Sequence, residues 1–209
     1  MRILIADDHS IVRKGLIQII SEMENIAVVD EASNGHEAIE KIQKFKYDIL
    51  VLDISMPDKN GLDVLKDLKI SDPKLPVLVL STYPEELFAV RSFKSGASGY
   101  LNKNTAPDEL GNAIKTVVRG NKYISKTLTQ YLASNLGEKE NQLPHEKLSD
   151  REFDIFRLLS EGRTTAEIAN ELSLSKKTVS THKTNLLAKM NLKCTAGIVI
   201  YAINNNLFI

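Results

Sequence analysis

Four short apolar segments recur through the first half of the chain, and none of them alternates apolar with polar residues. They are rich in Val, Ile and Leu and occupy residues 3–6, 27–29, 49–52 and 77–80. A strand buried on both faces has this composition, whereas a strand with one solvated face alternates apolar and polar residues. Doubly buried strands are typical of parallel sheets with helices on both sides. This pattern therefore predicts an α/β domain.

Segments of helical periodicity lie between these apolar runs. The first has apolar residues three and four apart, at Val12, Leu16, Ile19 and Met23, which is the stripe of an amphipathic helix. Four further helices are expected over residues 37–45, 62–70, 85–94 and 107–119. With a fifth short strand at 99–101, residues 1–120 contain five strand–helix units. We therefore expect a doubly wound, five-stranded parallel sheet with right-handed crossovers.

The composition of the chain changes after this region. Residues 125–136 repeat leucine at every fourth position, which favours one more helix, and residues 138–147 are polar and contain a proline. Such a polar stretch favours a linker. The chain is therefore expected to contain three parts: a first domain over 1–120, a helix and linker over 121–147, and a second domain over 148–209.

The second domain carries helix signals and no strand signals. Ser149 and Thr164 each begin a Ser/Thr-x-x-Glu capping box that precedes an apolar-periodic segment. Gly162 lies where the first of these helices should end. Ser175 is a further N-cap, and residues 195–205 supply the last helix. These signals predict an all-α domain of four helices.

Composition narrows the cellular setting. A single cysteine, Cys194, stands among 209 residues; it cannot form an internal disulfide, which fits a reducing compartment. The acidic pair Asp7-Asp8 follows only four apolar residues, so the N-terminus does not resemble a signal peptide. No apolar run approaches the roughly 18 residues of a membrane span. We expect a cytoplasmic protein that does not associate with membranes.

Charge is distributed unevenly along a chain whose formal net charge is zero. Residues 1–120 carry 15 basic and 18 acidic side chains, a net charge of −3, and residues 148–209 carry 8 and 6, a net charge of +2. Residues 175–193 contain five lysines and no acid. This asymmetry indicates two domains with different partners.

Charged and polar side chains follow four of the five predicted strands. The first strand ends in Asp7-Asp8, the third in Asp53 and the fourth in Ser81, and the fifth runs into Lys103. Each alone has an ordinary explanation, as a helix cap, a turn residue or a solvated lysine. Because ligands bind at the carboxyl ends of parallel strands, we expect these groups to meet in one crevice. Clustered carboxylates repel unless a cation is present, and Mg²⁺ prefers oxygen ligands.

Residues 1–120 resemble the receiver domain of bacterial two-component response regulators. The motifs that carry the resemblance are Asp7-Asp8-His9, Leu52-Asp53-Ile54-Ser55-Met56-Pro57, Leu80-Ser81 and Gly99-Tyr100-Leu101-Asn102-Lys103. Two positions depart from the commonest receiver pattern, Thr82 where alanine is frequent and Asn104 where proline often follows the lysine. The second departure leaves open whether the peptide between Lys103 and Asn104 is cis.

The resemblance implies a flavodoxin-like fold and a role for each matching residue. Asp53 is expected to accept the phosphoryl group, with Lys103 paired to the phosphoryl oxygens and Ser81 moving toward them. Tyr100 is expected to act as an aromatic switch behind Ser81, although a packed tyrosine would also fit the sequence. The implied Mg²⁺ ligands are Asp7, Asp8, Asp53 and the backbone carbonyl of Ser55.

The lysine-rich segment over residues 175–193 contains an amphipathic stretch when its residues are placed on a helical wheel. Its apolar side carries Val179, Leu186 and Met190, and the opposite side carries Lys177, Thr181, Thr184 and Ala188. A small, polar face suits approach to base edges in a major groove. The helix at 165–172 and the turn at 173–175 complete a helix-turn-helix. A solvated helix with lysines for solubility would have the same wheel.

Residues 146–209 resemble the LuxR-type helix-turn-helix. The matching motifs are Leu148-Ser149-Asp150-Arg151-Glu152, Gly162, Glu167-Ile168-Ala169, Leu172-Ser173-Leu174-Ser175, Thr178-Val179-x-x-His182 and Leu187-Ala188-Lys189-Met190. The resemblance implies base-facing side chains at Ser180, Thr181 and Thr184. It implies mainly phosphate contacts from Lys176, Lys177, Thr178 and His182. No Cys/His spacing indicates zinc, so His182 is expected to pack or to contact phosphate.

A receiver followed by a LuxR-type domain is the arrangement of NarL/FixJ response regulators. The expected function is a transcription regulator that a sensor histidine kinase phosphorylates, and that then dimerises and binds double-stranded DNA. We expect no enzymatic activity beyond phosphorylation and dephosphorylation of its own Asp53. The alternatives are an atypical receiver that acts without phosphate and a phosphohydrolase. The second is disfavoured because Ile-Ser-Met follows Asp53, which leaves no second aspartate two residues on.

Two copies of the second domain on DNA are expected to bind half-sites about 10 bp apart, with one recognition helix in each major groove. Ile198, Ala202 and Ile203 of the last helix are the predicted contact between protomers. The same three residues could instead close the four-helix core.

Overall fold

The computed structural model describes residues 1–24, 26–56, 59–134, 143–205 and 207. These residues form two compact units, the first over Met1–Ser134 and the second over the remainder of the chain. Pro57, which belongs to one of the receiver motifs, lies outside the described residues. No helix in the described ranges is long and apolar enough to cross a membrane.

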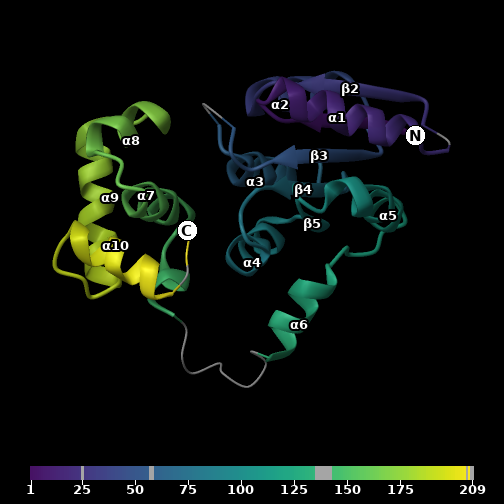
Figure 1. Cartoon of the computed structure of the whole chain (residues 1–209). Helices are drawn as coiled ribbons and strands as arrows, with labels where there is room; N and C mark the ends of the chain where they lie inside the picture. The colour runs from purple at the N-terminus through teal and green to yellow at the C-terminus, as the bar shows by residue number, and fades with distance from the viewer. Residues whose placement is uncertain (25, 57–58, 135–142, 206, 208–209) are drawn as a thin grey trace. The chain divides into compact units, whose positions relative to one another are not determined.

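The first unit is built on a parallel sheet of five strands in the order β2-β1-β3-β4-β5 (Figure 1). The strands are β1 (Arg2–Ala6), β2 (Val28–Ala32), β3 (Ile49–Asp53), β4 (Val77–Ser81) and β5 (Gly99–Asn102). The order reverses direction at β1, so the carboxyl ends of β1 and β3 flank the point at which ligands bind in such sheets. The predicted doubly wound fold is confirmed.

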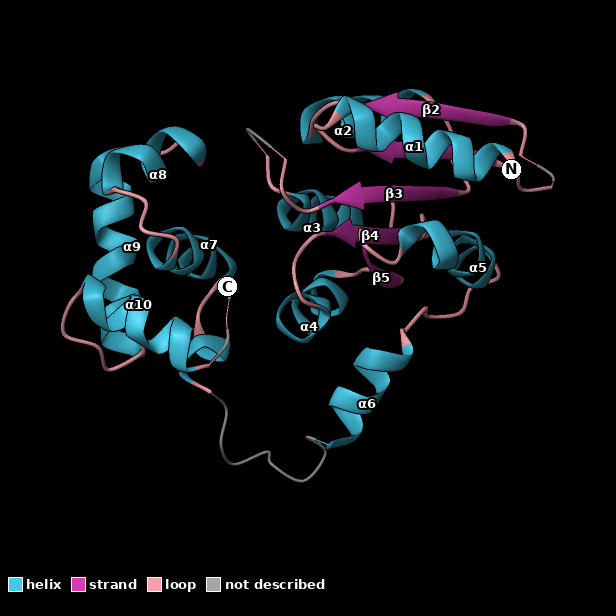
Figure 2. Ribbon diagram, viewed as in Figure 1, coloured by secondary structure: helices cyan, strands magenta, loops and turns pink. Residues whose placement is uncertain are grey.

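Helices cover both faces of this sheet (Figure 2). They are α1 (Ser10–Ser21), α2 (Gly35–Lys44), α3 (Gly61–Ser71), α4 (Glu85–Ser95) and α5 (Ala106–Val118). Helices α1 and α5 pack together on one face, and α3 contacts α2 and α4 on the other. Ile5, Val51 and Leu80 of the sheet pack with Leu16 of α1 and Ile114 of α5 in one apolar core.

The second strand differs from its prediction. It runs over Val28–Ala32 rather than residues 27–29, because Val28 to Ala32 pair in register with the five residues of β1. Its position at the edge of the sheet leaves Val28 40% exposed and admits Asp30 and Glu31, which a doubly buried strand would exclude. The expectation of burial on both faces is therefore wrong for this strand.

Helix α6 (Lys126–Ser134) belongs to the first unit and packs against α4. The contact begins at Ser125, whose hydroxyl donates to the Glu85 carboxylate and accepts from the backbone N–H of Leu128 at 3.0 Å. Ser125 and Leu128 are both buried. At the far end of the predicted linker, Pro144–Lys147 forms a short 3₁₀-helix in which His145 is buried.

Besides the 3₁₀-helix, the described residues of the second unit form four α-helices, as predicted. They are α7 (Asp150–Ser160), α8 (Thr165–Glu171), α9 (Lys176–Lys189) and α10 (Thr195–Asn204). Both predicted capping boxes are present, at Ser149 and Thr164, and the Ser175 side chain accepts from the backbone N–H of Thr178. Gly162 has a φ of +82° beyond the end of α7, a conformation that glycine adopts without the strain of a side chain.

Gly61 allows the start of α3 to approach β3 closely, and Gly15 on α1 provides a control for this packing. A Cβ at Gly61 would lie 2.3 Å from the Asp53 carbonyl oxygen, whereas a Cβ at Gly15 on α1 would meet nothing within 4 Å. We expect Gly61→Ala to lower the free energy of unfolding by about 1–3 kcal/mol through overpacking. Gly15→Ala should raise it by about 0.5–1 kcal/mol, because alanine favours the helix. Urea unfolding of both variants measures the difference, and equal effects would contradict the packing argument.

Candidate functional site

Two buried carboxylates share one ammonium at the carboxyl edge of the sheet. Asp7 follows β1 and is 1% exposed, and Asp53 ends β3 and is 2% exposed. Lys103, which follows β5, places its Nζ 2.6 Å from Asp7 Oδ2 and 2.8 Å from Asp53 Oδ2. Residues 7, 53 and 103, brought from three strands, therefore meet as the sequence predicts.

Burial and the neighbouring charges shift the pKa values of Asp53 and Lys103. Desolvation raises the pKa of Asp53, and the negative charge of Asp7 raises it further, while the Lys103 ammonium works in the opposite direction and offsets only part of the shift. Burial alone would lower the pKa of Lys103, but Asp53 and Asp7 hold it above its ordinary value. Lys103 therefore stays charged, and the two carboxylates carry more negative charge than one ammonium balances.

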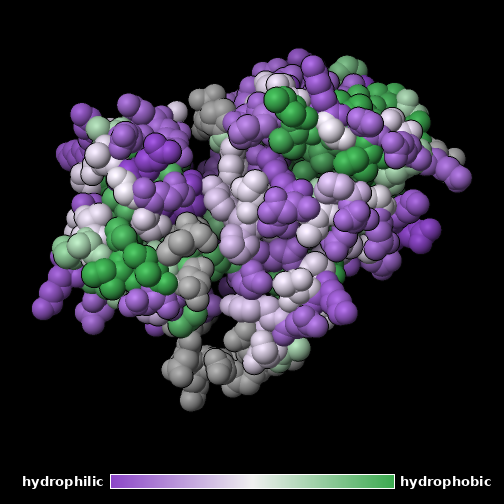
Figure 3. Space-filling model, in the orientation of Figure 1, coloured by the Kyte–Doolittle hydropathy of each residue, from purple (hydrophilic) through white to green (hydrophobic). Residues whose placement is uncertain are grey.

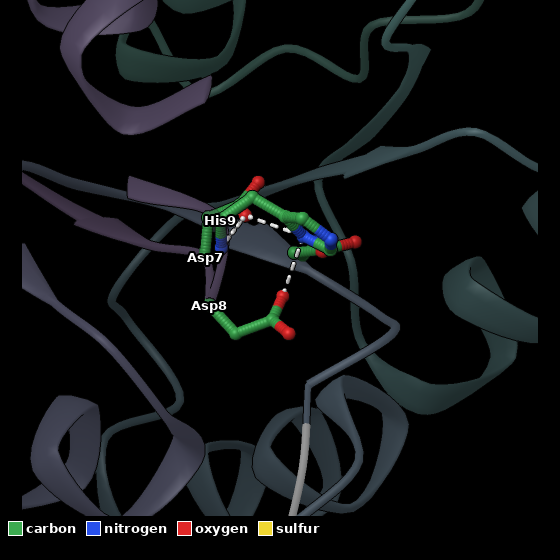
Figure 4. Close-up of side chains that lie close together, drawn as sticks. Asp7, Asp8 and His9 are labelled. Atoms are coloured by element: carbon green, nitrogen blue, oxygen red, sulfur yellow. Dashed lines mark hydrogen bonds and ion pairs between the residues drawn. The ribbon is translucent and has the colours of Figure 1, made fainter. Parts of the chain in front are cut away.

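Asp8 and His9 lie close to Asp7 (Figure 4), and both of their side chains are more exposed than that of Asp7. The backbone N–H of His9 donates to Asp7 Oδ1 at 2.8 Å, and His9 Nδ1 lies 2.8 Å from Asp8 Oδ1. One ligand atom from each of Asp7, Asp8, His9 and Asp53 can be chosen so that all lie within 4.8 Å of one another. Apart from their ion pairs with Lys103 and His9, Asp7 Oδ2 and Asp8 Oδ1 are buried atoms that receive no hydrogen bond. This surplus of oxygen lone pairs fits a hard dication such as Mg²⁺.

Ser55, the fourth predicted metal ligand, lies two residues after Asp53 in the chain. Its backbone N–H donates to Asp53 Oδ1 at 3.2 Å, which orients the carboxylate of the predicted phosphoacceptor. The peptide that follows Lys103 is trans, so Asn104 continues the chain without the cis bond that the sequence left open.

Ser81 and Tyr100 lie beside the cluster and are fully buried. The Ser81 hydroxyl accepts from the backbone N–H of Tyr83 at 3.1 Å. The carbonyl of Tyr83 accepts from the Tyr100 hydroxyl at 3.0 Å and from the Asn102 side chain at 3.1 Å. Ser81 and Tyr100 thus both bond to the backbone of Tyr83, and burial raises the pKa of the Tyr100 phenol well above its ordinary value.

Arg13 and Asn102 also hold this site, and the sequence predicted no role for either. Arg13 of α1 donates to the backbone carbonyl of Asp7 at 2.6 Å and pairs with Glu31 of β2 at 2.9 Å. Asn102 bonds to the carbonyl of Tyr83 and accepts from the backbone N–H of Asn104 at 2.9 Å. Neither of these roles has a local sequence signal, because the carbonyls of Asp7 and Tyr83 come near Arg13 and Asn102 only in the folded unit.

Helix α9 presents the predicted polar face to solvent. Of the seven residues predicted to contact DNA, five are exposed: Lys176, Lys177, Ser180, Thr181 and Thr184. The other two, Thr178 and His182, are half-buried. The apolar side of the wheel is buried as expected, at Val179, Leu186 and Met190.

Charged side chains of α7 hold both helices of the helix-turn-helix, α8 and α9. Lys189 at the end of α9 places its Nζ 2.6 Å from Glu152 Oε2, and Arg151 donates to the carbonyl of Leu172 at the end of α8 at 3.2 Å. Burial would raise the pKa of Glu152, but the bonds from Lys189 and Ser149 hold it below its ordinary value. Glu152 thus caps α7 and anchors α9 with one carboxylate.

The structure corrects the predicted contact surface of α10. Ile198 and Ala202 are 0% and 2% exposed, so they belong to the core and cannot meet a second protomer. Ile203 is 53% exposed and Ile200, which the prediction omitted, is 58% exposed. An apolar patch is visible over α10 in Figure 3. The helix turns Ile200 and Ile203 outward because Ile198 and Ala202, one turn apart, face α7.

Both units match described protein families. Residues 3–115 match the family described as "Response regulator receiver domain", and residues 146–202 match "Bacterial regulatory proteins, luxR family". Together the two matches extend over most of the chain and correspond to its two units.

Full-length relatives and solved structures share both units. The chain is 37% identical to "Oxygen regulatory protein NreC" of Staphylococcus carnosus (strain TM300) and 36% identical to that of Staphylococcus aureus (strain JH9), over 99% of each chain. RcsB from Salmonella enterica serovar Typhimurium, bound to promoter rprA with the phosphomimetic BeF3-, is similar at 27% identity. Its TM-score is 0.70, with 96% of this chain and 98% of that chain covered. The response regulator ChrA of a heme-sensing two-component system gives 28% identity and a TM-score of 0.54, covering 98% and 97%.

The charge imbalance of the cluster predicts opposite effects of two substitutions in metal-free buffer. Lys103→Met leaves Asp7 and Asp53 without a cation and should lower the free energy of unfolding by about 3–5 kcal/mol. Asp53→Asn removes an aspartate whose pKa is raised by folding, so it should stabilise the fold. Because folding raises the pKa of Asp53, ionisation of Asp53 destabilises the folded state. The gain in stability from Asp53→Asn should therefore grow as the pH rises above about 4. Urea unfolding in EDTA between pH 4 and 8 measures both effects; a gain that shrinks with pH would contradict the assignment.

Proposed function

This chain belongs to the NarL-type response regulators, DNA-binding transcription regulators that join a receiver domain to a LuxR-type domain, and from that premise we propose that phosphorylation of Asp53 controls its binding to DNA. The observation that carries the proposal is the ammonium of Lys103 between the buried carboxylates of Asp7 and Asp53. A sensor histidine kinase would supply the phosphoryl group. No catalysis is proposed beyond phosphorylation and dephosphorylation of the chain itself.

The cluster has the parts that phosphoryl transfer to a carboxylate requires. Asp53 is the nucleophile, and Ser55 orients it through its backbone N–H. Lys103 remains charged and would pair with the oxygens of the transferred group, because this chemistry depends on position and charge neutralisation. Asp7, Asp8, Asp53 and the Ser55 carbonyl would hold Mg²⁺. When bound, the ion neutralises charge on the phosphoryl oxygens.

Ser81 and Tyr100 would carry the signal away from Asp53. Both bond to the backbone of Tyr83, so a Ser81 hydroxyl that turns toward a phosphoryl group releases the N–H of Tyr83. Tyr83 stacks on Phe88 of α4 with ring centroids 4.5 Å apart, which links its loop to that helix. We propose that this loop and α4 change position together on phosphorylation and thereby favour the dimer.

The second unit would bind double-stranded DNA through α9. The exposed Ser180, Thr181 and Thr184 would face base edges, and Lys176, Lys177, Thr178 and His182 would contact phosphates. Because two copies present two such helices, a dimer should bind half-sites about 10 bp apart. Ile200 and Ile203, exposed on α10, are the corrected candidates for the contact between the two copies.

Phosphorylation of Asp53 is tested by intact mass after incubation with Mg²⁺ and acetyl phosphate. The wild-type chain should gain a single phosphoryl group, and Asp53→Asn should gain none, because the amide is not a nucleophile. Asp63→Asn is the matched control, since Asp63 is an exposed acid of α3 and should leave labelling unchanged. A wild-type chain that takes no phosphate would favour the atypical receiver, and a labelled Asp53→Asn would place the acceptor elsewhere.

The DNA-binding face is tested with one phosphate-contact and one base-contact variant. Lys177→Ala should weaken binding to specific and scrambled DNA alike and reduce the slope of log affinity against log salt by about 1. Thr184→Ala should instead change the ratio between the two affinities. Lys46→Ala removes an exposed lysine of the first unit and should change neither. If neither α9 variant alters binding at several salt concentrations, α9 is not the recognition helix.

A further inference from the structure

His9 places a ring nitrogen against the acidic cluster. His9 Nδ1 lies 2.8 Å from Asp8 Oδ1, which is the distance of an ion pair. One ligand atom from each of Asp7, Asp8, His9 and Asp53 can be chosen so that all lie within 4.8 Å of one another. A neutral imidazole and carboxylate oxygens that lie this close together can also bind one metal ion together.

The distances around His9 agree with that arrangement. Octahedral ligands at 2.0–2.1 Å from a metal lie about 3 Å from their neighbours. His9 Nδ1 lies 2.8 Å from Asp8 Oδ1 and 3.5 Å from Asp7 Oδ1. The imidazole approaches from the solvent, since its side chain is 63% exposed, whereas Asp7 is buried below it. An incoming ion would meet the imidazole and the carboxylates together (Figure 4).

We propose that His9 is a nitrogen ligand of the cation site, which therefore binds a first-row transition dication such as Co²⁺ or Zn²⁺ more tightly than Mg²⁺. The inference rests on the proposed Mg²⁺ site and adds its selectivity. Three carboxylates alone are suited to Mg²⁺, Ca²⁺ or Mn²⁺, whereas imidazole favours transition metals. The same cluster thus accepts Mg²⁺ through oxygen alone and a transition ion through oxygen and Nδ1.

A positioning role for His9 is the competing explanation. In that role the ring would only orient the Asp8 carboxylate, and its loss would weaken every cation to a similar extent. A ligand role predicts a loss confined to transition ions. His9→Asn separates the two, because the amide keeps a polar group near the Nδ1 position but is a poor ligand for these metals.

Calorimetric titration of the full chain with Mg²⁺ and with Co²⁺ measures the selectivity. Wild type should bind Co²⁺ more tightly than Mg²⁺. His9→Asn should lose at least about tenfold in Co²⁺ affinity and keep its Mg²⁺ affinity. His36→Asn is the matched control, since His36 is an exposed histidine of the same unit on α2, and it should behave as wild type.

Ring ¹⁵N spectra of the histidines supply a second readout. Zn²⁺ should shift the Nδ1 resonance of His9, and Mg²⁺ should leave it in place. An equal loss of Mg²⁺ and Co²⁺ affinity in His9→Asn, or an unchanged Co²⁺ affinity, would overturn the ligand role while Mg²⁺ binding by wild type still supported the proposed function. Wild type that bound neither ion would overturn the cation site itself, and the inference with it.

Discussion

The ion pair of Lys103 with Asp7 and Asp53 is the constraint on which the first unit depends. Two carboxylates that are almost completely buried would repel strongly in a medium of low dielectric, and one ammonium offsets only part of that repulsion. The ends of three strands must therefore stay in register for the cluster to exist. A site with excess negative charge is also one that a dication stabilises, so the cost in stability and the proposed cation site have the same origin.

Close backbone packing keeps the cluster in place and connects it to the rest of the unit. Gly61 lets the start of α3 approach the Asp53 carbonyl, and Arg13 holds the carbonyl of Asp7. On the other side, the bonds from Ser81 and Tyr100 meet at the backbone of Tyr83. The next helix begins two residues later at Glu85, which accepts from Ser125 at the start of α6. A continuous set of contacts thus runs from the site to the last helix of the first unit.

The second unit uses one carboxylate for two purposes. Glu152 completes the capping box that begins α7 and also binds Lys189 at the end of α9. The contact with Lys189 holds α9 at its C-terminal end, and the middle of that helix exposes small polar side chains. Such a face makes few intramolecular contacts and is available to a nucleic acid. The aromatic side chains of His145, Phe156 and Tyr201 pack against one another, with His145 Nδ1 2.9 Å from the Tyr201 hydroxyl, and connect the 3₁₀-helix to α10.

Local pattern alone determined much of this protein. The apolar runs located β1, β3, β4 and β5, the acids and the lysine that follow the strands identified the site, and the capping residues located the starts of α7, α8 and α9. These features are set by neighbouring residues, because strand burial and N-caps depend on composition and spacing along the chain. Tertiary structure alone decided that β2 is an exposed edge, that Ile200 rather than Ile198 faces outward on α10, and that His9 stands against Asp8. Those outcomes depend on which distant segment covers each face, and periodicity in the sequence does not specify that partner.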